Sequence, residues 1–165
     1  MLENLDLDSL FDSESKYGKE HIMGELTDDM ISRAEENIGY KLTESYKELL
    51  RFQNGGLIDD DESWLTAIYG IGAEADAMNG LEDMFVNWME EWEYPNIGIP
   101  FGETQTAGHD MFFMDYRNID VNGEPEIVLV ENEGGPEDVT IKHIADNFRQ
   151  FLQMVIDGEN IEGEE

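Results

Sequence analysis

The stretch MFFMDYRNIDVNGEPEIVLVE, residues 111–131, decides the fold class of this chain. It holds two apolar runs, residues 111–116 and 126–131, which have the length and the aromatic or β-branched content of strands. Asn122-Gly123 lies between the runs, and this dipeptide favours the positive backbone angles of a tight hairpin turn. We therefore predict a β-hairpin over this stretch.

Two segments upstream of the hairpin are also predicted to be strands. Residues 64–71 are strand-like, and residues 97–101 form a shorter apolar run. Gly98 and Pro100 interrupt the shorter run, and proline cannot donate a hydrogen bond to a neighbouring strand. This run therefore suits the edge of a sheet or the beginning of a strand.

Helical signals lie on both sides of the predicted strands. Thr27 and Thr43 are good caps for two helices, of which the first ends at Gly39 and the second before Asn54-Gly55-Gly56. A third helix is predicted over residues 81–92. Its apolar stripe would be Leu81, Met84, Phe85, Trp88, Met89 and Trp92, and its polar face Glu82, Asp83, Glu90 and Glu91.

A fourth helix is predicted over residues 140–156, with His143 near its start. Its stripe would be Ile141, Ile144, Ala145, Phe148, Leu152 and Val155. Helices around a run of mostly antiparallel strands give an α+β fold, and the length suits one domain. We assign residues 1–25 to an acidic arm that is either loosely attached or a short helix, 26–158 to the domain and 159–165 to an acidic, disordered tail.

The charge of the chain is its most unusual property. Nine basic side chains stand against forty acidic ones, so the formal net charge is −31. Such a surface repels nucleic acid and anionic lipid, which excludes both as direct partners, and it attracts basic proteins. The alternative is that the acidity reflects a salt-adapted organism, in which most proteins are acidic.

The sequence also bears on the compartment. There is no cysteine, so disulfides and thiolate metal sites are excluded. The amino-terminal residues lack the basic and apolar segments of a secretory signal, and no segment approaches the ~20 apolar residues of a membrane span. We expect a cytoplasmic protein.

Two segments are candidate chemical sites: an acidic loop and a motif that contains a histidine. The loop Asp59-Asp60-Asp61-Glu62 resembles the start of a calcium loop, but Trp64 and Gly70 stand where such a loop needs glycine and glutamate. A solvated acidic loop is therefore favoured, and no metal or other cofactor is expected. Gly108-His109-Asp110 could orient a ligand or could fix a loop, and the second interpretation is favoured.

Several ordered motifs resemble one known family. They are LTESYKELL at residues 42–50, QNGG at 53–56, IGIPFG at 97–102, GHDM at 108–111, MDY at 114–116, GEPEIV at 123–128, and Ile144-Ala145 followed by Phe148 and Phe151. Over residues 27–156 the chain resembles the SMI1/KNR4 (SUKH) superfamily. It departs from the family in its acidic arm and tail and in the inserted helix at residues 81–92.

The resemblance implies an α+β fold with a single mixed, mostly antiparallel sheet flanked by helices. It also implies a bacterial immunity protein that binds and neutralises a toxin domain, often a nuclease, and it transfers no catalytic residue. The alternative is a regulatory scaffold in a signalling or cell-wall pathway, as for a fungal relative. An enzyme that uses His109 or a metal is less favoured than either.

The expected partner is a basic toxin domain, since a nuclease cleft must be basic to hold phosphate. The residues expected to contact it are the acidic loop with its neighbouring tryptophan and the acids after the second hairpin strand: Asp59, Asp60, Asp61, Glu62, Trp64, Glu131, Glu133, Glu137 and Asp138.

Overall fold

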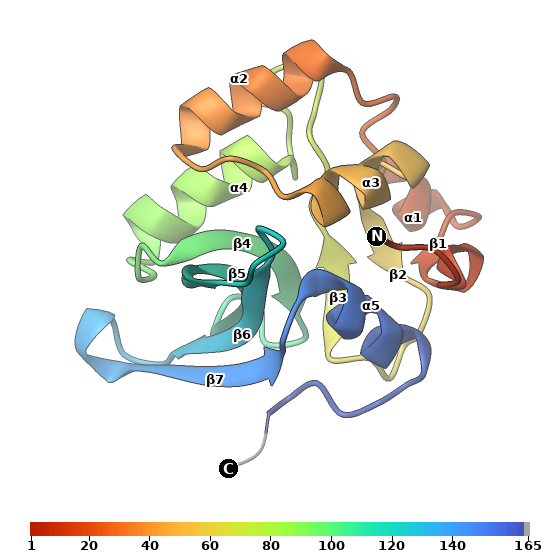
Figure 1. The fold of residues 1–165 in the computed structure, drawn as a ribbon. Helices are drawn as coiled ribbons and strands as arrows, with labels where there is room; N and C mark the ends of the chain where they lie inside the picture. The colour runs from red at the N-terminus through yellow and green to blue at the C-terminus, as the bar shows by residue number, and fades with distance from the viewer. Residues whose placement is uncertain (164–165) are drawn as a thin grey trace.

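The computed structural model describes residues 1–163, and of Pro136 only the backbone. Within them, a seven-stranded antiparallel sheet is flanked by five α-helices, which is an α+β fold (Figure 1). The strands are β1 (Phe11–Asp12), β2 (Gly56–Ile58), β3 (Leu65–Ile68), β4 (Gly98–Thr104), β5 (Asp110–Ile119), β6 (Pro125–Asn132) and β7 (Val139–Ala145). The helices are α1 (Lys16–Glu20), α2 (Asp28–Ile38), α3 (Glu44–Phe52), α4 (Leu81–Val86) and α5 (Phe148–Ile156).

The sheet is a meander, because the strands lie side by side in the order in which the chain makes them. Every strand pair in the described part of the chain is antiparallel. The predicted hairpin is confirmed as β5 and β6, in which Phe112 lies opposite Leu129. Gly123 adopts a φ of 78°, as the turn prediction requires.

The helices that were predicted from threonine caps are confirmed. The hydroxyl of Thr27 accepts a hydrogen bond from the Met30 amide at 3.2 Å, and that of Thr43 accepts one from the Tyr46 amide at 3.1 Å. Residues 81–92 are helical as predicted, although α4 continues as a π-helical segment, η2 (Asn87–Glu91). The polar face assigned to this helix was wrong at Glu82, which is buried.

Residues 97–101 were expected at the edge of a sheet or at the beginning of a strand. The second alternative is confirmed, because β4 begins at Gly98, whereas the edge position was wrong, because β4 pairs with both β3 and β5. A shift of register between Pro100 and Gly102 accommodates the missing proline donor inside the sheet. Gly98 is required by close packing, since a Cβ there would lie 1.9 Å from the carbonyl oxygen of Met114.

The helix predicted over residues 140–156 was wrong in its first part. Residues 139–145 form β7, and α5 begins only after Asn147, whose side chain accepts a hydrogen bond from the Gln150 amide at 2.8 Å. Pairing with β6 and the β-branched residues of this segment favour the strand. His143 therefore projects from a strand, not from a helix.

Helices cover both faces of the sheet. On one face, Phe112 packs against Phe151 of α5 with ring centroids 4.9 Å apart, and Tyr46 of α3 contacts Phe148 at 5.8 Å. Phe113 points to the opposite face, as consecutive strand residues do, and contacts Tyr94 at 5.6 Å. Figure 1 shows α4 over this region and α2 lying outside α4.

Both ends of the described chain are attached to the core. Leu2, Leu10 and Phe11 are buried, and β1 adds a strand beside β2, so residues 1–25 are not loosely attached. The alternative expectation of a short helix in this segment is met by α1. Ile161 is buried in the tail that was expected to be disordered. Residues 164–165 of that tail lie outside the described residues. None of the described helices has the length and apolar character needed to cross a bilayer.

Candidate partner-binding surface

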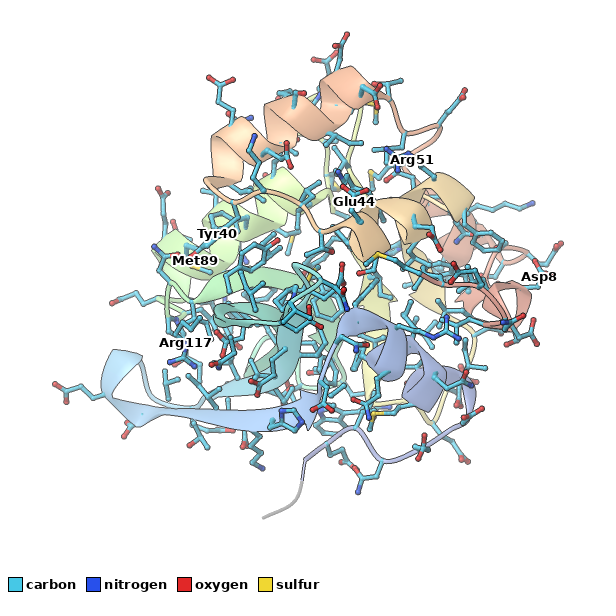
Figure 2. All side chains as sticks on the ribbon, in the orientation of Figure 1. Asp8, Tyr40, Glu44, Arg51, Met89 and Arg117 are labelled. Atoms are coloured by element: carbon cyan, nitrogen blue, oxygen red, sulfur yellow. The ribbon has the colours of Figure 1, made fainter. Side chains whose placement is uncertain are left out.

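The acidic loop joins β2 to β3 and presents its carboxylates to solvent. Asp59, Asp60, Asp61 and Glu62 are all exposed. The loop has a defined shape, because the Asp60 side chain accepts a hydrogen bond from the Glu62 amide at 3.0 Å and Gln105 donates to the Ser63 carbonyl at 2.7 Å. The four acids therefore form a fixed, solvated group. Figure 2 shows that oxygen-tipped side chains also project around the rest of the molecule.

Trp64 follows this loop and is partly buried. Its indole nitrogen donates a hydrogen bond to the carboxylate of Asp110 at 3.3 Å. One hollow of about 540 Å³ lies between the indole, Asp60, Glu62 and the tail. A second of about 360 Å³ lies between the indole, Glu131 and the tail. The fold thus gathers acids from the β2–β3 loop, from β5 and β6 and from the tail around one tryptophan.

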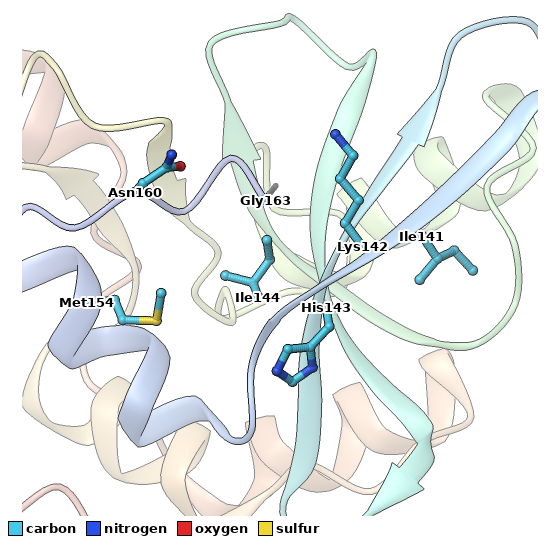
Figure 3. A pocket seen from close by; sticks show the side chains of 7 residues that line it. All are labelled: Ile141, Lys142, His143, Ile144, Met154, Asn160 and Gly163. Carbon is cyan, nitrogen blue, oxygen red and sulfur yellow. The ribbon is translucent and has the colours of Figure 1, made fainter. Parts of the chain in front are cut away.

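A cation is held within this group. The ammonium of Lys142 lies 2.8 Å from a carboxylate oxygen of Glu131. Figure 3 shows a pocket at β7. Lys142 and His143 project from opposite sides of the strand, and Asn160 and Gly163 of the tail also line the pocket. The side chains of Lys142 and His143 both line this pocket, but only Lys142 also lines a hollow at Trp64.

The remaining predicted contact residues lie elsewhere. Glu133, Glu137 and Asp138 occupy the exposed connection between β6 and β7, and none of them lines the two hollows at Trp64. The Asn132 side chain donates to the Trp92 carbonyl at 2.7 Å and so fixes the start of this connection beside η2. The structure therefore divides the predicted contact residues into two groups.

The three residues of the Gly108-His109-Asp110 motif have separate packing roles. Gly108 has a φ of 106°, and its carbonyl accepts a hydrogen bond from the Tyr94 hydroxyl at 2.6 Å. The His109 ring packs edge-to-face on Trp92 with centroids 5.9 Å apart. These contacts hold the loop against η2 and the segment after it.

Asp110 is buried and accepts hydrogen bonds from the hydroxyls of Thr104 and Thr106 as well as from Trp64. It therefore fixes both the β4–β5 loop and the indole. His109 and Asp110 have different partners, so this geometry favours the interpretation that the motif fixes a loop. Within residues 1–163, no three acids and histidines are arranged to hold a metal ion.

Sequence reasoning missed the burial of Glu82. Glu82 lies in the first turn of the predicted helix, where the helix dipole favours a carboxylate. This position gave no reason to expect that the carboxylate is buried. Its partners are Arg33 and Asn37 of α2, which are far away in the sequence. Only the folded chain brings them together.

No curated protein resembles the chain to a significant degree. The sequence model described as the SMI1 / KNR4 family (SUKH-1) matches residues 25–154, which is most of the chain.

Proposed function

The chain belongs to the SMI1/KNR4 family (SUKH-1), and from this premise we propose that it is an immunity protein that neutralises a basic toxin domain in a stoichiometric complex. The proposed toxin is a nuclease. A nuclease must hold phosphate groups, so its active cleft carries positive charge, and an acidic protein can occupy or shield such a cleft.

The observation that carries this proposal is the fixed acidic loop beside Trp64. Four exposed carboxylates precede an indole that is held in place by Asp110. Charge at the rim of an interface speeds the encounter of the partners, whereas a positioned aromatic side chain contributes to the lifetime of the complex. The loop and Trp64 supply both features on one surface.

We infer a binding role instead of a catalytic one. The His109 ring contacts Trp92, whereas His143 contacts Glu126 and Asp146. A nucleophile or general base would need these groups to converge on one point, with a reacting atom within hydrogen-bond reach. The two histidines are assigned to different surfaces, so the proposed function uses neither as a catalyst.

The test begins with capture of the partner by the tagged full-length chain from its own cells, followed by identification and separate expression of the captured protein. We expect that protein to arrest growth of a test cell when expressed alone and to be harmless when co-expressed with the chain. A captured protein that is harmless when expressed alone would contradict the toxin assignment and favour the scaffold alternative.

A further inference from the structure

The turn between β5 and β6 presents apolar side chains to water. Val121 is fully exposed, and Ile119 is half exposed beside it. Tight turns favour glycine, asparagine, aspartate and serine, whereas a β-branched residue at a turn has no conformational advantage there. Val121 buries none of its surface in the folded chain, so its side chain gives no packing energy to the fold.

This turn is held rigidly. The Asp120 amide donates to the Glu124 carbonyl at 2.9 Å, and the Gly123 amide donates to the Asp120 carbonyl at 3.1 Å. The Asp120 carboxylate in addition accepts hydrogen bonds from the amides of Asn122 at 2.8 Å and Glu124 at 3.0 Å. The backbone that carries Val121 is thereby held in one conformation.

The base of the turn is anchored to α3. Glu124 is buried, and its carboxylate accepts hydrogen bonds from the hydroxyl and the amide of Ser45. A side chain on such a preorganised frame loses little conformational freedom when it binds, and this favours affinity.

A hollow of about 290 Å³ lies beside Ile119. Its charged lining consists of Asp120, Glu126, His143 and Asp146, so three carboxylates face one imidazole. His143 contacts Glu126 at 2.7 Å and Asp146 at 3.3 Å, and Asp146 remains largely exposed. The hollow therefore suits a positively charged side chain.

The charges around the turn indicate what kind of molecule binds there. Arg117 is the cationic residue that lies nearest to this turn in the sequence, and it is paired with Asp115 at 2.9 Å. A second copy of the chain would bring the same carboxylates to this surface together with its own net charge of −31. Like charges facing one another oppose association, so self-association does not fit this surface.

We propose that the β5–β6 turn is an anchor for the partner protein: Val121 enters an apolar pocket of the partner, and a lysine or arginine at the rim of that pocket enters the hollow lined by Asp120, Glu126 and Asp146. This inference rests on the proposed function and adds a binding site that lies apart from the loop at Trp64. A small rigid apolar anchor next to a charged contact is a common basis of tight protein binding.

The test uses Val121→Ser and the matched variant Val86→Ser, since Val86 is a half-exposed valine on α4. The probe is the protein captured by the wild-type chain, purified and titrated calorimetrically against each full-length variant. We expect Val121→Ser to raise the Kd at least about tenfold and Val86→Ser to change it less than about twofold. The urea midpoint of Val121→Ser should equal that of the wild type, because the valine is fully exposed.

Asp146→Asn tests the hollow separately. We expect it to weaken binding at low salt and to reduce the salt dependence of the Kd, because it removes one carboxylate from the hollow.

The outcomes distinguish the two proposals. If Val121→Ser binds as tightly as the wild type while the wild type still protects cells, the anchor is wrong and the proposed function stands. If sedimentation shows a dimer that Val121→Ser abolishes, the occupant is a second copy and the assignment to a partner is wrong. If the wild type neither binds the captured protein nor protects cells that express it, both proposals are wrong.

Discussion

The carboxylate of Glu82 lies 2.6 Å from the guanidinium of Arg33 and thereby joins α4 to α2. Glu82 also accepts a hydrogen bond from Asn37 at 2.5 Å, and Arg33 donates to the carbonyls of Gly72 and Ala73 at 2.7 Å each. One buried carboxylate thus connects two helices and the segment that leads into α4.

Glu82→Gln should destabilise the chain. The substitution leaves Arg33 without its charged partner, and loss of a charge-assisted contact at a largely buried site costs about 2–3 kcal/mol. Urea unfolding measures this difference. The exposed neighbour provides the control: Asp83→Asn should change the free energy of unfolding by less than about 0.5 kcal/mol. Equal effects of the two substitutions would contradict the role of Glu82.

Glu124 should make stability depend on pH. Burial raises the pKa of its carboxyl group above the usual value, while hydrogen bonds from Ser45 act in the opposite direction. Because the pKa is higher in the folded state, Glu124 makes its full contribution to the free energy of unfolding when the pH is below the pKa of the unfolded state. This contribution is lost as the pH rises through the pKa of the folded state. Glu124→Gln should therefore gain stability relative to the wild type as the pH rises from about 4 towards neutrality.

Free energies of unfolding measured across this pH range for the wild type and Glu124→Gln provide the comparison. Glu36→Gln removes an exposed carboxylate as a control. Parallel pH curves for the wild type and Glu124→Gln would show that the burial of Glu124 has no such effect.

Neutralising the acidic loop should slow binding to the captured partner. The combined variant Asp59→Asn, Asp60→Asn, Asp61→Asn and Glu62→Gln should lower the association rate constant about tenfold at low salt, because steering depends on local charge. The difference should shrink at high salt. Stopped-flow kinetics at two ionic strengths measure both effects.

A control variant removes the same amount of charge from exposed acids elsewhere: Glu14→Gln, Glu20→Gln, Glu25→Gln and Glu36→Gln. It should slow association less than the loop variant does. If both variants behave alike, overall charge and not this loop guides the encounter.

Asp110→Ala and His109→Ala should differ in their effect on stability. Asp110 is a buried acceptor for Thr104, Thr106 and Trp64, so its loss should cost about 2–3 kcal/mol. His109 contributes one edge-to-face ring contact, and its loss should cost about 1 kcal/mol. Thermal and urea unfolding measure both effects. A larger effect for His109 than for Asp110 would reverse the assignment of their structural roles.

The elements that were predicted correctly depend on local signals. Thr27 and Thr43 cap their helices through side-chain hydrogen bonds to amides three residues later, which any sequence reading can anticipate. The β5–β6 hairpin has its turn residues between its own strands. Such features need no knowledge of the rest of the chain.

The start of β7 could not be predicted in this way. Ile141, Ile144, Ala145 and Phe148 have helical spacing, but the segment becomes a strand because β6 offers it a partner. Two local signals opposed a continuous helix: the β-branched residues of its first part, and Asn147, a strong helix cap that lies inside the predicted helix.

The candidate site was predicted only in part. The acidic loop and Trp64 are contiguous in sequence, whereas their proximity to Glu131 depends on the order of the strands. Glu82 was one acid among forty acidic residues, and nothing local distinguished it as a buried one. The exposure of Val121 was not predicted, because Asn122-Gly123 accounts for the turn and says nothing about the valine beside it.

The order of the strands has a consequence for synthesis on the ribosome. From β4 to β7, each strand pairs with the one made just before it, so this half of the sheet can grow by addition as the chain emerges. Phe148 and Phe151 of α5 emerge after all seven strands, yet they cover Phe101 and Phe112 of the sheet. A nascent chain stopped before α5 would leave the rings of Phe101 and Phe112 without this cover, so this part of the core is completed only after α5 has been made.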